Sequence, residues 1–429
     1  MTQRSDTIER ASASPGQRFA GRRGAVVLFS SYPDDPRPRR ATEALAAEGM
    51  EMDVVCLKAE PDEPSSERIG NVYVRRLPIR HHRSGKLRYT LEYGMFLLAA
   101  LLILAFRGVR RRYSIVHVHN MPDILVFAAI VPKLLGAKVL LDLHDPMPEL
   151  MRTIYGLPPS GRSIRVLELL ERWSIGFSDA AITVNEACRR IFAGRSCRAA
   201  KLHVIMNSPD EAIFGYRVPD PSTRANLDRP FVIMYHGTLV ERNGLGLAVE
   251  ALANVRSQVP GAELRVFGRP TPYGEQVRQL VSDRGLSGAV RFLGERSLEQ
   301  LVEAINEVDV GVIPNQRSIF TEINTPTRIF EYLARGLPVV APRAPGIMDY
   351  FGESELFLFE LGNAADLTRA LLRVHADPEE ARRCVERGQA VYRAHRWSQE
   401  RLSFLALVSR LLGVRAEEPE AVDQFARPA

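Results

Sequence analysis

Short runs of branched apolar residues alternate with amphipathic segments through the first half of the chain. Runs of this length and composition are typical of parallel strands that are buried on both faces. They occupy Ala25–Ser30, Met52–Leu57, Val72–Leu77, Ile115–His119, Val139–Leu143, Ala180–Val184 and Leu202–Ile205. Helical spacing of apolar residues appears between them at Ala41–Glu48, Leu91–Phe106 and Ile124–Leu135. The alternation predicts a doubly wound α/β domain, with helices on both faces of a parallel sheet.

A second alternating series follows a stretch rich in proline and glycine. Its strands are expected at Phe231–His236, Glu263–Phe267, Val290–Leu293, Asp309–Ile313, Pro338–Ala341 and Leu356–Phe359. Its helices are expected at Leu245–Val259, Tyr273–Arg284, Leu298–Glu307, Pro326–Arg335 and Ala365–Val374. Because ligands of such sheets bind at the carboxyl ends of the strands, two such domains are expected to hold their site in a cleft between them.

These patterns divide the chain into six segments. The first is polar, contains no apolar core of a secretory signal, and is expected to be a flexible leader. The predicted order is a leader at 1–20, a first domain at 21–206, a linker at 207–228, a second domain at 229–395, a helix at 396–414 that packs back toward the first domain, and a flexible tail at 415–429.

Composition narrows the class of protein. The 429 residues are 45% hydrophobic and 25% charged, which is a globular balance and excludes wholesale disorder. The net charge of +6 is spread along the chain, so duplex nucleic acid is not an expected partner. Only five of the 57 cationic side chains are lysine, which reflects either coding bias or the suitability of arginine for phosphate groups. The four cysteines lack metal-binding or disulfide spacing.

One apolar stretch resembles a membrane segment. Tyr93–Phe106 has 14 residues and would form a helix about 21 Å long, short of the ~30 Å hydrocarbon core. Cations flank it on both sides, at Arg83, Lys86, Arg88, Arg107, Arg110, Arg111 and Arg112. Two interpretations remain open: a helix buried on a sheet, or a segment at 83–112 that also rests on an anionic membrane surface.

The most distinctive local pattern is EINTPTRIFEYLARGLPVVA, in the second domain. Thr325 suits an N-cap, Pro326 the first helical position and Gly336 the C-terminal cap. The free amides of such a helix start suit a diphosphate, and Arg328 adds positive charge there. Glu331 could accept hydrogen bonds from a ribose diol. The alternative is a capped surface helix with a solvated glutamate.

A second pattern, YHGTLVERNGLGLAVE, runs from a strand through a loop into a helix. Gly237 would allow close approach of a backbone, and Arg242 could bind phosphate oxygens. Gly244 and Gly246 are a weak hint of a dinucleotide fingerprint, but the third position is Val249, so a nicotinamide enzyme is not favoured.

Polar residues also follow two strands of the first domain. His144 and Asp145 come directly after a strand, where they could serve general acid–base chemistry or simply cap the next helix. His119 and Asn120 end another strand and are interpreted as cleft residues. His117 shares a strand face with His119, but no third ligand has suitable spacing, so no metal site is expected.

The segments YHGTLVERNGLGLAVEAL and TPTRIFEYLARGLPVVAP together resemble those of retaining, nucleotide-sugar-dependent glycosyltransferases of family 4. The order of IVHVHN, LDLHDPMPE, VIMNSPDEAIF and a helix at Trp397 is similar to that family too, and the resemblance covers roughly residues 24–412. It implies the GT-B fold, two Rossmann-like domains facing a cleft. It also implies metal-independent transfer with no cofactor beyond the nucleotide-sugar substrate.

The resemblance assigns roles to individual residues. Glu331 would hold the donor ribose, and His144 would contact the donor sugar. The remaining donor-binding residues would be Gly237, Arg242, Glu322, Asn324, Thr325 and Arg328, with the amides of Asn324 and Thr325 at the diphosphate.

The sequence departs from the family at three places. The second glutamate of the family would fall on Ile323, one place from Glu322. Thr238 and Asn243 replace the usual arginine and lysine, and Arg242 could substitute for that lysine. Arg328 stands where relatives often carry lysine. These changes keep diphosphate binding as the expectation and leave the donor sugar open.

The predicted function is a cytoplasmic, peripheral membrane glycosyltransferase that moves a sugar to a lipid-linked glycan in surface polysaccharide or glycoconjugate biosynthesis. No nucleophilic carboxylate is evident, so retention is expected to follow a front-face route. Two alternatives are a nucleotide-sugar 2-epimerase of the same fold and an inactive partner protein that binds nucleotide sugar or membrane.

Overall fold

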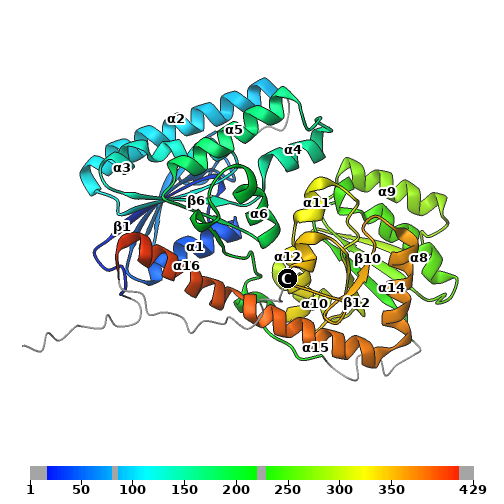
Figure 1. Ribbon diagram of the computed structural model, residues 1–429. Coiled ribbons are helices and arrows are strands. Elements are labelled where there is room, and N and C mark those ends of the chain that lie inside the picture. Colours follow the sequence, from blue (N-terminus) through cyan, green and yellow to red (C-terminus); the bar gives the residue numbers. More distant parts are fainter. Residues whose placement is uncertain (1–16, 80–85, 220–228, 415–429) are drawn as a thin grey trace, which may run out of the picture. The chain divides into compact units, whose positions relative to one another are not determined.

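The computed structural model describes residues 17–79, 86–219 and 229–414 (Figure 1). Their contacts form two compact units. Within the described residues the first unit comprises 17–79, 86–144, 170–182 and 403–414, and the second comprises 145–169, 183–219 and 229–402. The predicted tail lies outside the described residues, as do 1–16 of the predicted leader. Phe19 of that leader is fully buried, and its N–H donates to Glu48 O, so the described end of the leader packs on the first unit.

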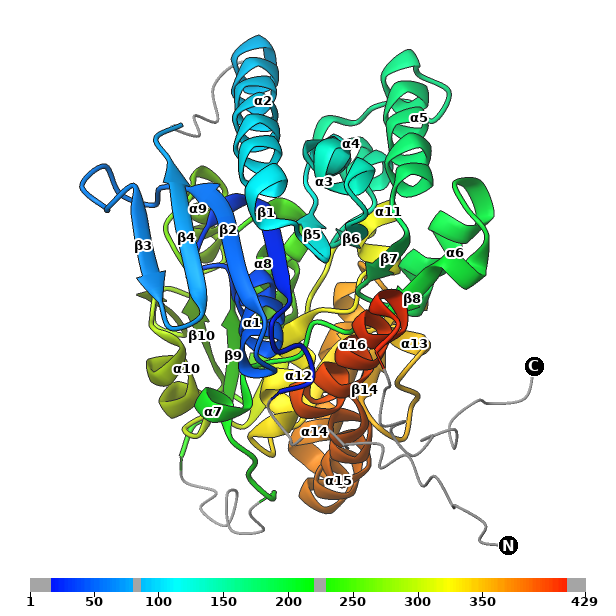
Figure 2. The same ribbon diagram turned by 90° about the vertical axis from the view of Figure 1, so that its left-hand side faces the viewer.

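An eight-stranded sheet has the order β3-β4-β2-β1-β5-β6-β7-β8, with β3 at one edge (Figure 2). β3 runs antiparallel to β4, and β4, β2, β1, β5 and β6 pair in parallel. The strands are β1 (Arg23–Ser31), β2 (Glu51–Leu57), β3 (Ser66–Ile69), β4 (Val72–Leu77), β5 (Ile115–His119), β6 (Lys138–Leu143), β7 (Ala180–Thr183) and β8 (Leu202–Val204).

Helices cover both faces of this sheet. On one face lie α2, the 3-10 helix η1 and α3, and on the other lie α1 and the end of α16 (Figure 1). Phe96 of α2 packs on Phe29 of β1, and Phe404 of α16 packs on His117 of β5. The bounds are α1 (Pro36–Ala47), α2 (Lys86–Arg111), η1 (Asp123–Ala129), α3 (Ile130–Leu134) and α16 (Trp397–Leu412).

The second unit holds a six-stranded, wholly parallel sheet with the order β11-β10-β9-β12-β13-β14. Along β9, Ile233 and Tyr235 enter one hydrophobic cluster while Val232 and Met234 enter the other, as burial on both faces requires. The strands are β9 (Val232–His236), β10 (Glu263–Phe267), β11 (Val290–Gly294), β12 (Val310–Val312), β13 (Val339–Pro342) and β14 (Phe357–Phe359).

The second unit contains both expected and unexpected helices, and α8, α12 and α14 contact strands of this sheet. The pattern-based helices are α8 (Leu245–Arg256), α9 (Pro272–Asp283), α10 (Leu298–Ile305), α12 (Thr327–Ala334) and α14 (Ala364–Ala376). Several others were not predicted: α4 (Met147–Tyr155), α6 (Glu186–Arg195), η2 (Ala199–Lys201), α7 (Glu211–Phe214), η4 (Glu241–Asn243), α11 (Ile319–Ile323), α13 (Pro345–Met348) and α15 (Pro378–His395). α5 (Arg162–Phe177), also unpredicted, has residues in both units.

The expected doubly wound α/β architecture is confirmed, and every strand expected from the sequence is present. Two details were wrong. α1 begins at Pro36, because prolines are tolerated in a first turn. The helix expected at Ile124–Leu135 splits into η1 and α3, since Pro132 removes an amide from a continuous helix. The expected linker contains α7, while its residues 220–228 lie outside the described residues. The domain boundaries stay predictions.

α2 is longer than its apolar stretch indicated. Its 26 residues include a 21-residue part, Leu91–Arg111, that is long and apolar enough to cross a membrane, although a single such helix is weak support for a span. One face is buried at Phe96, Ala100 and Leu104. An opposite apolar stripe is between 54% and 63% exposed and consists of Leu91, Met95, Leu98, Leu102, Phe106 and Val109.

Candidate active site

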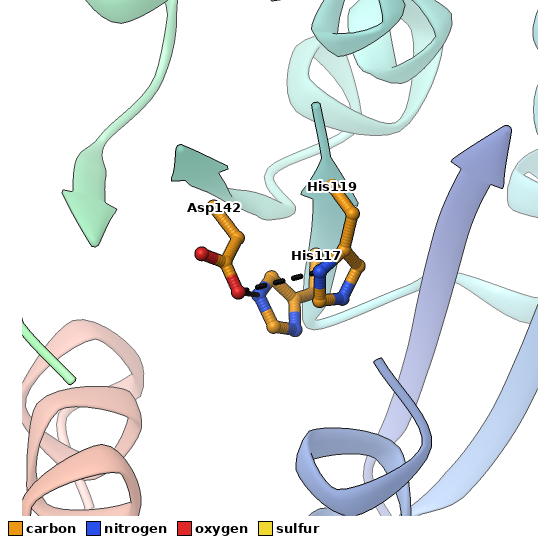
Figure 3. A group of neighbouring side chains, drawn as sticks. All are labelled: His117, His119 and Asp142. Atoms are coloured by element: carbon orange, nitrogen blue, oxygen red, sulfur yellow. Dashed lines mark ion pairs between the residues drawn. The ribbon is translucent and has the colours of Figure 1, made fainter. Parts of the chain in front are cut away.

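Three side chains of the first unit meet where β5 and β6 end. Strand register pairs His119 with Asp142, and His144 follows Asp142 by two residues. His119 Nδ1 lies 3.3 Å from Asp142 Oδ2 and 3.0 Å from His144 Nε2. Figure 3 shows His119 and Asp142 reaching toward each other from neighbouring strands. The two predicted histidines are therefore in direct contact, and both lie beside an aspartate that was not singled out.

Arg37, in the first turn of α1, binds both oxygens of the Asp142 carboxylate. Its Nε donates to Oδ2 at 2.9 Å and its Nη2 to Oδ1 at 2.8 Å. Burial would raise the pKa of Asp142, but the charge of Arg37 and the neighbouring rings of His144 and His119 lower it further, so the pKa lies well below its ordinary value. Asp142 is thus a buried, ionised group that only accepts hydrogen bonds.

His117, His119 and Asp142 also form a potential metal-ligand set, with ligand atoms within 4.8 Å of one another (Figure 3). The expectation that no third ligand exists was therefore wrong, because strand pairing brings Asp142 beside His119. The donor set nevertheless fits a cation poorly, since Arg37 already places a positive charge against the only anionic ligand. Burial lowers the pKa of both His117 and His119, so both rings are neutral at pH 7.

Asn120 has a supporting role in the same loop. Its Oδ1 accepts the His144 N–H at 2.8 Å, and its Nδ2 donates to Asp123 at 2.9 Å. It is buried, so it holds the loop after β6 in place and offers little surface to an acceptor. Asp145 is half-buried and follows His144 at the start of the segment that leads into α4.

In the second unit, the predicted ribose-binding residue contacts the end of β9. Glu331 on α12 has a side chain only 14% exposed, and its Oε2 lies 3.2 Å from His236 Nε2, which is not aligned well enough for a full hydrogen bond. Burial, assisted by the charge of Arg328, lowers the pKa of His236 to about 3, so this imidazole is neutral at pH 7. The alternative of a solvated surface glutamate does not fit this burial.

Two basic residues lie near the same strand end. Arg328 Nη1 donates to His236 O at 2.7 Å, beside Gly237, whose φ of +122° favours glycine. Arg242 lies on η4, with its guanidinium 6.0 Å from the Phe320 ring centroid. Both are partly exposed, so each has donors available for phosphate oxygens.

The start of α12 differs from the prediction. Thr325 does not cap it, because its hydroxyl donates to Gly346 O at 2.6 Å, and Pro326 takes the N-cap position instead. The Asn324 N–H, expected at a diphosphate, donates to Phe320 O at 3.2 Å in the last turn of α11. The available amides are thus those of the first turn, from Thr327 onward.

Other predicted residues in this loop are positioned as follows. Glu322 is 38% exposed and lies 3.4 Å from Arg317 Nη1, which makes it a surface ion pair. The buried Asn324 Oδ1 has no hydrogen-bond partner among the described residues. Thr325 Oγ1 also accepts from Asn185 Nδ2 at 3.0 Å, within the second unit.

Sequence reasoning missed His236, Asp142 and Arg37. The strand-end rule that selected Gly237 would also have selected His236, its neighbour. Alternation along a strand places Asp142 on the same side as His144, a signal that was present but not used. No local pattern marks Arg37, which reaches Asp142 across 105 positions.

Comparison with protein families gives two matches that together cover most of the chain. Residues 36–208 match the model described as a glycosyl transferase 4-like domain, and residues 220–391 match glycosyl transferases group 1.

Among curated relatives, the amylovoran biosynthesis glycosyltransferase AmsK of Erwinia amylovora is 26% identical over 183 residues, which is 42% of this chain and 43% of that protein. A GDP-mannose-dependent α-(1-6)-phosphatidylinositol monomannoside mannosyltransferase of Mycobacterium tuberculosis is 29% identical over 198 residues, covering 44% and 50%. The chain spans about half the length of these relatives.

Solved structures share the fold over nearly the whole chain. Sucrose-phosphate synthase from Thermosynechococcus elongatus gives a TM-score of 0.72 at 20% identity, covering 92% of this chain and all (100%) of that one. Anabaena HepE in complex with UDP gives 0.68 at 14% identity, covering 91% and 100%.

Proposed function

The chain belongs to the family 4 glycosyltransferases with the GT-B fold, which act on nucleotide sugars, and from this premise we propose that it transfers a hexose to a lipid-linked glycan with retention of anomeric configuration. The observation that carries the donor half of this proposal is the buried Glu331 carboxylate beside the first turn of α12. A relative that takes part in amylovoran biosynthesis supports a role in polysaccharide or glycoconjugate assembly.

On the donor side, the first-turn amides of α12 bind the diphosphate, with Arg328 and Arg242 supplying positive charge. Glu331 accepts two hydrogen bonds from the ribose diol. Because negative charge develops on the diphosphate as it leaves, these amides and guanidinium groups stabilise the transition state more than the bound donor. No metal ion is required, since the arginines neutralise that charge.

Retention follows from a front-face reaction. The bond from the anomeric carbon to the diphosphate oxygen breaks, the acceptor oxygen bonds to the same face of that carbon, and the acceptor proton passes to the departing diphosphate. A double displacement would instead need an ionised carboxylate within reach of the carbon. Asp142 does not supply it, because Arg37 holds both of its oxygens in a buried pair.

The apolar stripe of α2 (Leu91, Met95, Leu98, Leu102, Phe106 and Val109) is proposed to rest on the anionic inner surface of the cytoplasmic membrane. Exposed arginines at 110, 111 and 112 end the helix and complement such a surface. The helix lies along the interface, since crossing the bilayer would expose Phe96, Ala100 and Leu104, which pack inside the first unit.

A donor screen tests the proposal. Uridine, guanosine and adenosine diphosphates and their sugars are compared by thermal shift, since a specific ligand stabilises the folded protein by mass action. The stabilising sugar nucleotide is then incubated with membranes that contain lipid-linked glycan. Nucleoside diphosphate release that depends on the acceptor supports transfer. Conversion of the donor without acceptor indicates the epimerase, and binding without turnover indicates an inactive partner protein.

A further inference from the structure

The contact between His119 and His144 determines which ring nitrogen of His144 carries a proton. We propose that Asp142 and His119 hold His144 in the form protonated at Nδ1, so that His144 donates a hydrogen bond to a substrate oxygen and does not act as a general base. The proton position is a property of the protein without substrate. Only the identity of the group that receives this hydrogen bond rests on the proposed function.

The first step concerns Asp142 and His119. Asp142 is ionised and already accepts hydrogen bonds from Nε and Nη2 of Arg37. It has no proton to donate and can offer only lone pairs to His119. His119 Nδ1 lies 3.3 Å from Asp142 Oδ2. This pair is not aligned well enough for a full hydrogen bond, but the ionised carboxylate attracts a proton on His119 Nδ1 and would repel a lone pair there, so the proton lies on Nδ1.

The other nitrogen of His119 supports the same assignment. His119 Nε2 is buried and has no hydrogen-bond partner among the described residues. Were the proton on Nε2, a buried donor would be left unsatisfied, and the Nδ1 lone pair would lie beside the carboxylate. Burial lowers the pKa of this ring, so it carries one proton, and that proton is on Nδ1.

The second step passes the constraint to His144. Its Nε2 lies 3.0 Å from His119 Nδ1 and 3.7 Å from Asp142 Oδ2. Since His119 Nδ1 is protonated, His144 Nε2 must accept, and a neutral imidazole then carries its hydrogen on Nδ1.

The surroundings hold both rings in this relation. The His117 ring packs on His119 with centroids 4.2 Å apart, as the neighbouring positions in Figure 3 show, and Phe404 packs on His117 at 5.5 Å. The backbone of His144 is held by Asn120. His144 is the ring of this group that reaches the surface, with 23% of its side chain exposed. Asp142 and His119 are thus positioning residues, and His144 alone meets the substrate.

Nitrogen NMR tests the proton positions directly. Protein labelled with ¹⁵N at histidine is recorded without ligand at pH 7, and His144→Gln and His119→Asn spectra assign the rings. We expect a protonated Nδ1 and an unprotonated Nε2 for His144, and a protonated Nδ1 for His119. A proton on His144 Nε2 would overturn the proposal, whether or not the protein proves to be a glycosyltransferase.

Replacing His144 with amide side chains tests whether this residue acts as a hydrogen-bond donor or as a general base. Asparagine places an N–H near the position of Nδ1, whereas glutamine places it near Nε2, and neither is basic. We expect His144→Gln to lower kcat about a hundredfold, as loss of an oriented donor does, while His144→Asn loses about tenfold or less. Equal losses in the two variants would contradict the donor role and indicate a base.

The positioning role of His119 has its own readout. His119→Asn keeps an N–H directed at His144 and is expected to retain the protonation pattern of His144, while His119→Leu is expected to lose it. Melting temperatures show whether each variant is folded. A His119→Leu protein that folds and leaves the His144 resonances unchanged would refute the positioning role of His119. If no donor sugar turns over in the unmodified protein, the proposed function fails while the NMR result stands.

Discussion

His236 Nε2 lies 3.2 Å from Glu331 Oε2, at the point where β9 ends beside α12. The imidazole is neutral, because burial lowers its pKa to about 3, so the contact joins a polar ring to a carboxylate and is not an ion pair at pH 7. His236, the last residue of a central strand, thus lies against the carboxylate that we assign to the donor ribose.

Stability should fall in acid because of His236. Its folded pKa of about 3 is below the unfolded value near 6.5, so the unfolded chain binds more protons between these two pH values. The contribution is complete above about pH 6.5 and is lost as the pH falls toward 3, by about 3 kcal/mol between pH 7 and pH 4. Urea unfolding at several pH values measures it.

His236→Gln should remove this part of the pH dependence, while His203→Gln, at a half-exposed position, should keep it. The buried rings of His117 and His119 add to the loss in the same direction, so a residual slope remains in His236→Gln. Parallel stability curves for the unmodified protein and His236→Gln would show that folding does not lower the pKa of this imidazole.

Nucleotide binding should depend on Glu331 far more than on Glu322. Glu331→Gln is expected to weaken nucleoside diphosphate binding about tenfold to a hundredfold, because hydrogen bonds to a charged acceptor are lost. Glu322→Gln should change the affinity less than about threefold, since that carboxylate forms a surface pair with Arg317. Isothermal titration provides both affinities, and comparable losses would mean that Glu322 also contacts the nucleotide.

Removing Arg37 should be strongly destabilising. Arg37→Met leaves the Asp142 charge buried without its partner and is expected to cost about 3–5 kcal/mol. Adding Asp142→Asn should recover part of that loss, because the buried group is then neutral. Arg39→Met, which affects a 4.0 Å surface pair with Glu43, should cost less than about 1 kcal/mol. Urea midpoints measure all four proteins; a double variant no more stable than Arg37→Met would argue against a buried charge.

Membrane association should depend on the exposed stripe of α2. Replacing Leu98, Leu102 and Phe106 with glutamine should lower binding to vesicles of phosphatidylglycerol and phosphatidylcholine at least about tenfold, since each buried apolar side chain contributes about 1.5–3 kcal/mol. The control replaces the exposed Leu298 and Met348 of the second unit. Co-sedimentation and melting temperature are measured together. Undiminished sedimentation of the folded triple variant would reject the membrane proposal.

Two glycines with similar backbone angles offer a matched pair. Gly244 and Gly285 have φ of +71° and +67°, so alanine is strained by about 1–2 kcal/mol at either. At Gly244 a Cβ would also lie 1.7 Å from Pro314 O, whereas at Gly285 it meets nothing within 4 Å. Gly244→Ala should therefore be less stable by at least about a further 1 kcal/mol and should bind nucleotide more weakly. Equal urea midpoints for the two variants would mean that the segments at Gly244 and Pro314 can move apart to make room for the Cβ.

The strands were predictable because buried parallel strands consist of uninterrupted apolar runs. β3 was missed since Ser66, Glu67 and Arg68 make it a polar edge strand. α11 has five residues, too few to show helical periodicity. α5 was missed although it is long, because Val166, Leu169 and Trp173 are exposed and blur its apolar face.

Residues of the candidate site could be predicted where a local sequence pattern identifies them. Strand ends selected His144, and the pattern around Pro326 selected Glu331. The residues that hold these side chains in place could not be predicted. Their contacts depend on strand register and on residues that are distant in the sequence. His119 faces Asp142 only through the pairing of β5 with β6, and Arg37 comes from another helix.

The first unit is built mainly from early residues of the chain and includes a helical segment much later in it. Residues 403–414 belong to it, and Phe404 packs on the ring of His117 in its central sheet. During synthesis, β8, the last strand of this sheet in chain order, leaves the ribosome about two hundred residues before Phe404. Part of one apolar face of the nascent first unit therefore stays uncovered until residues 403–414 have been made. Chaperones that bind apolar surface can act for the longest time at that face. A chain released before residue 403 leaves it uncovered.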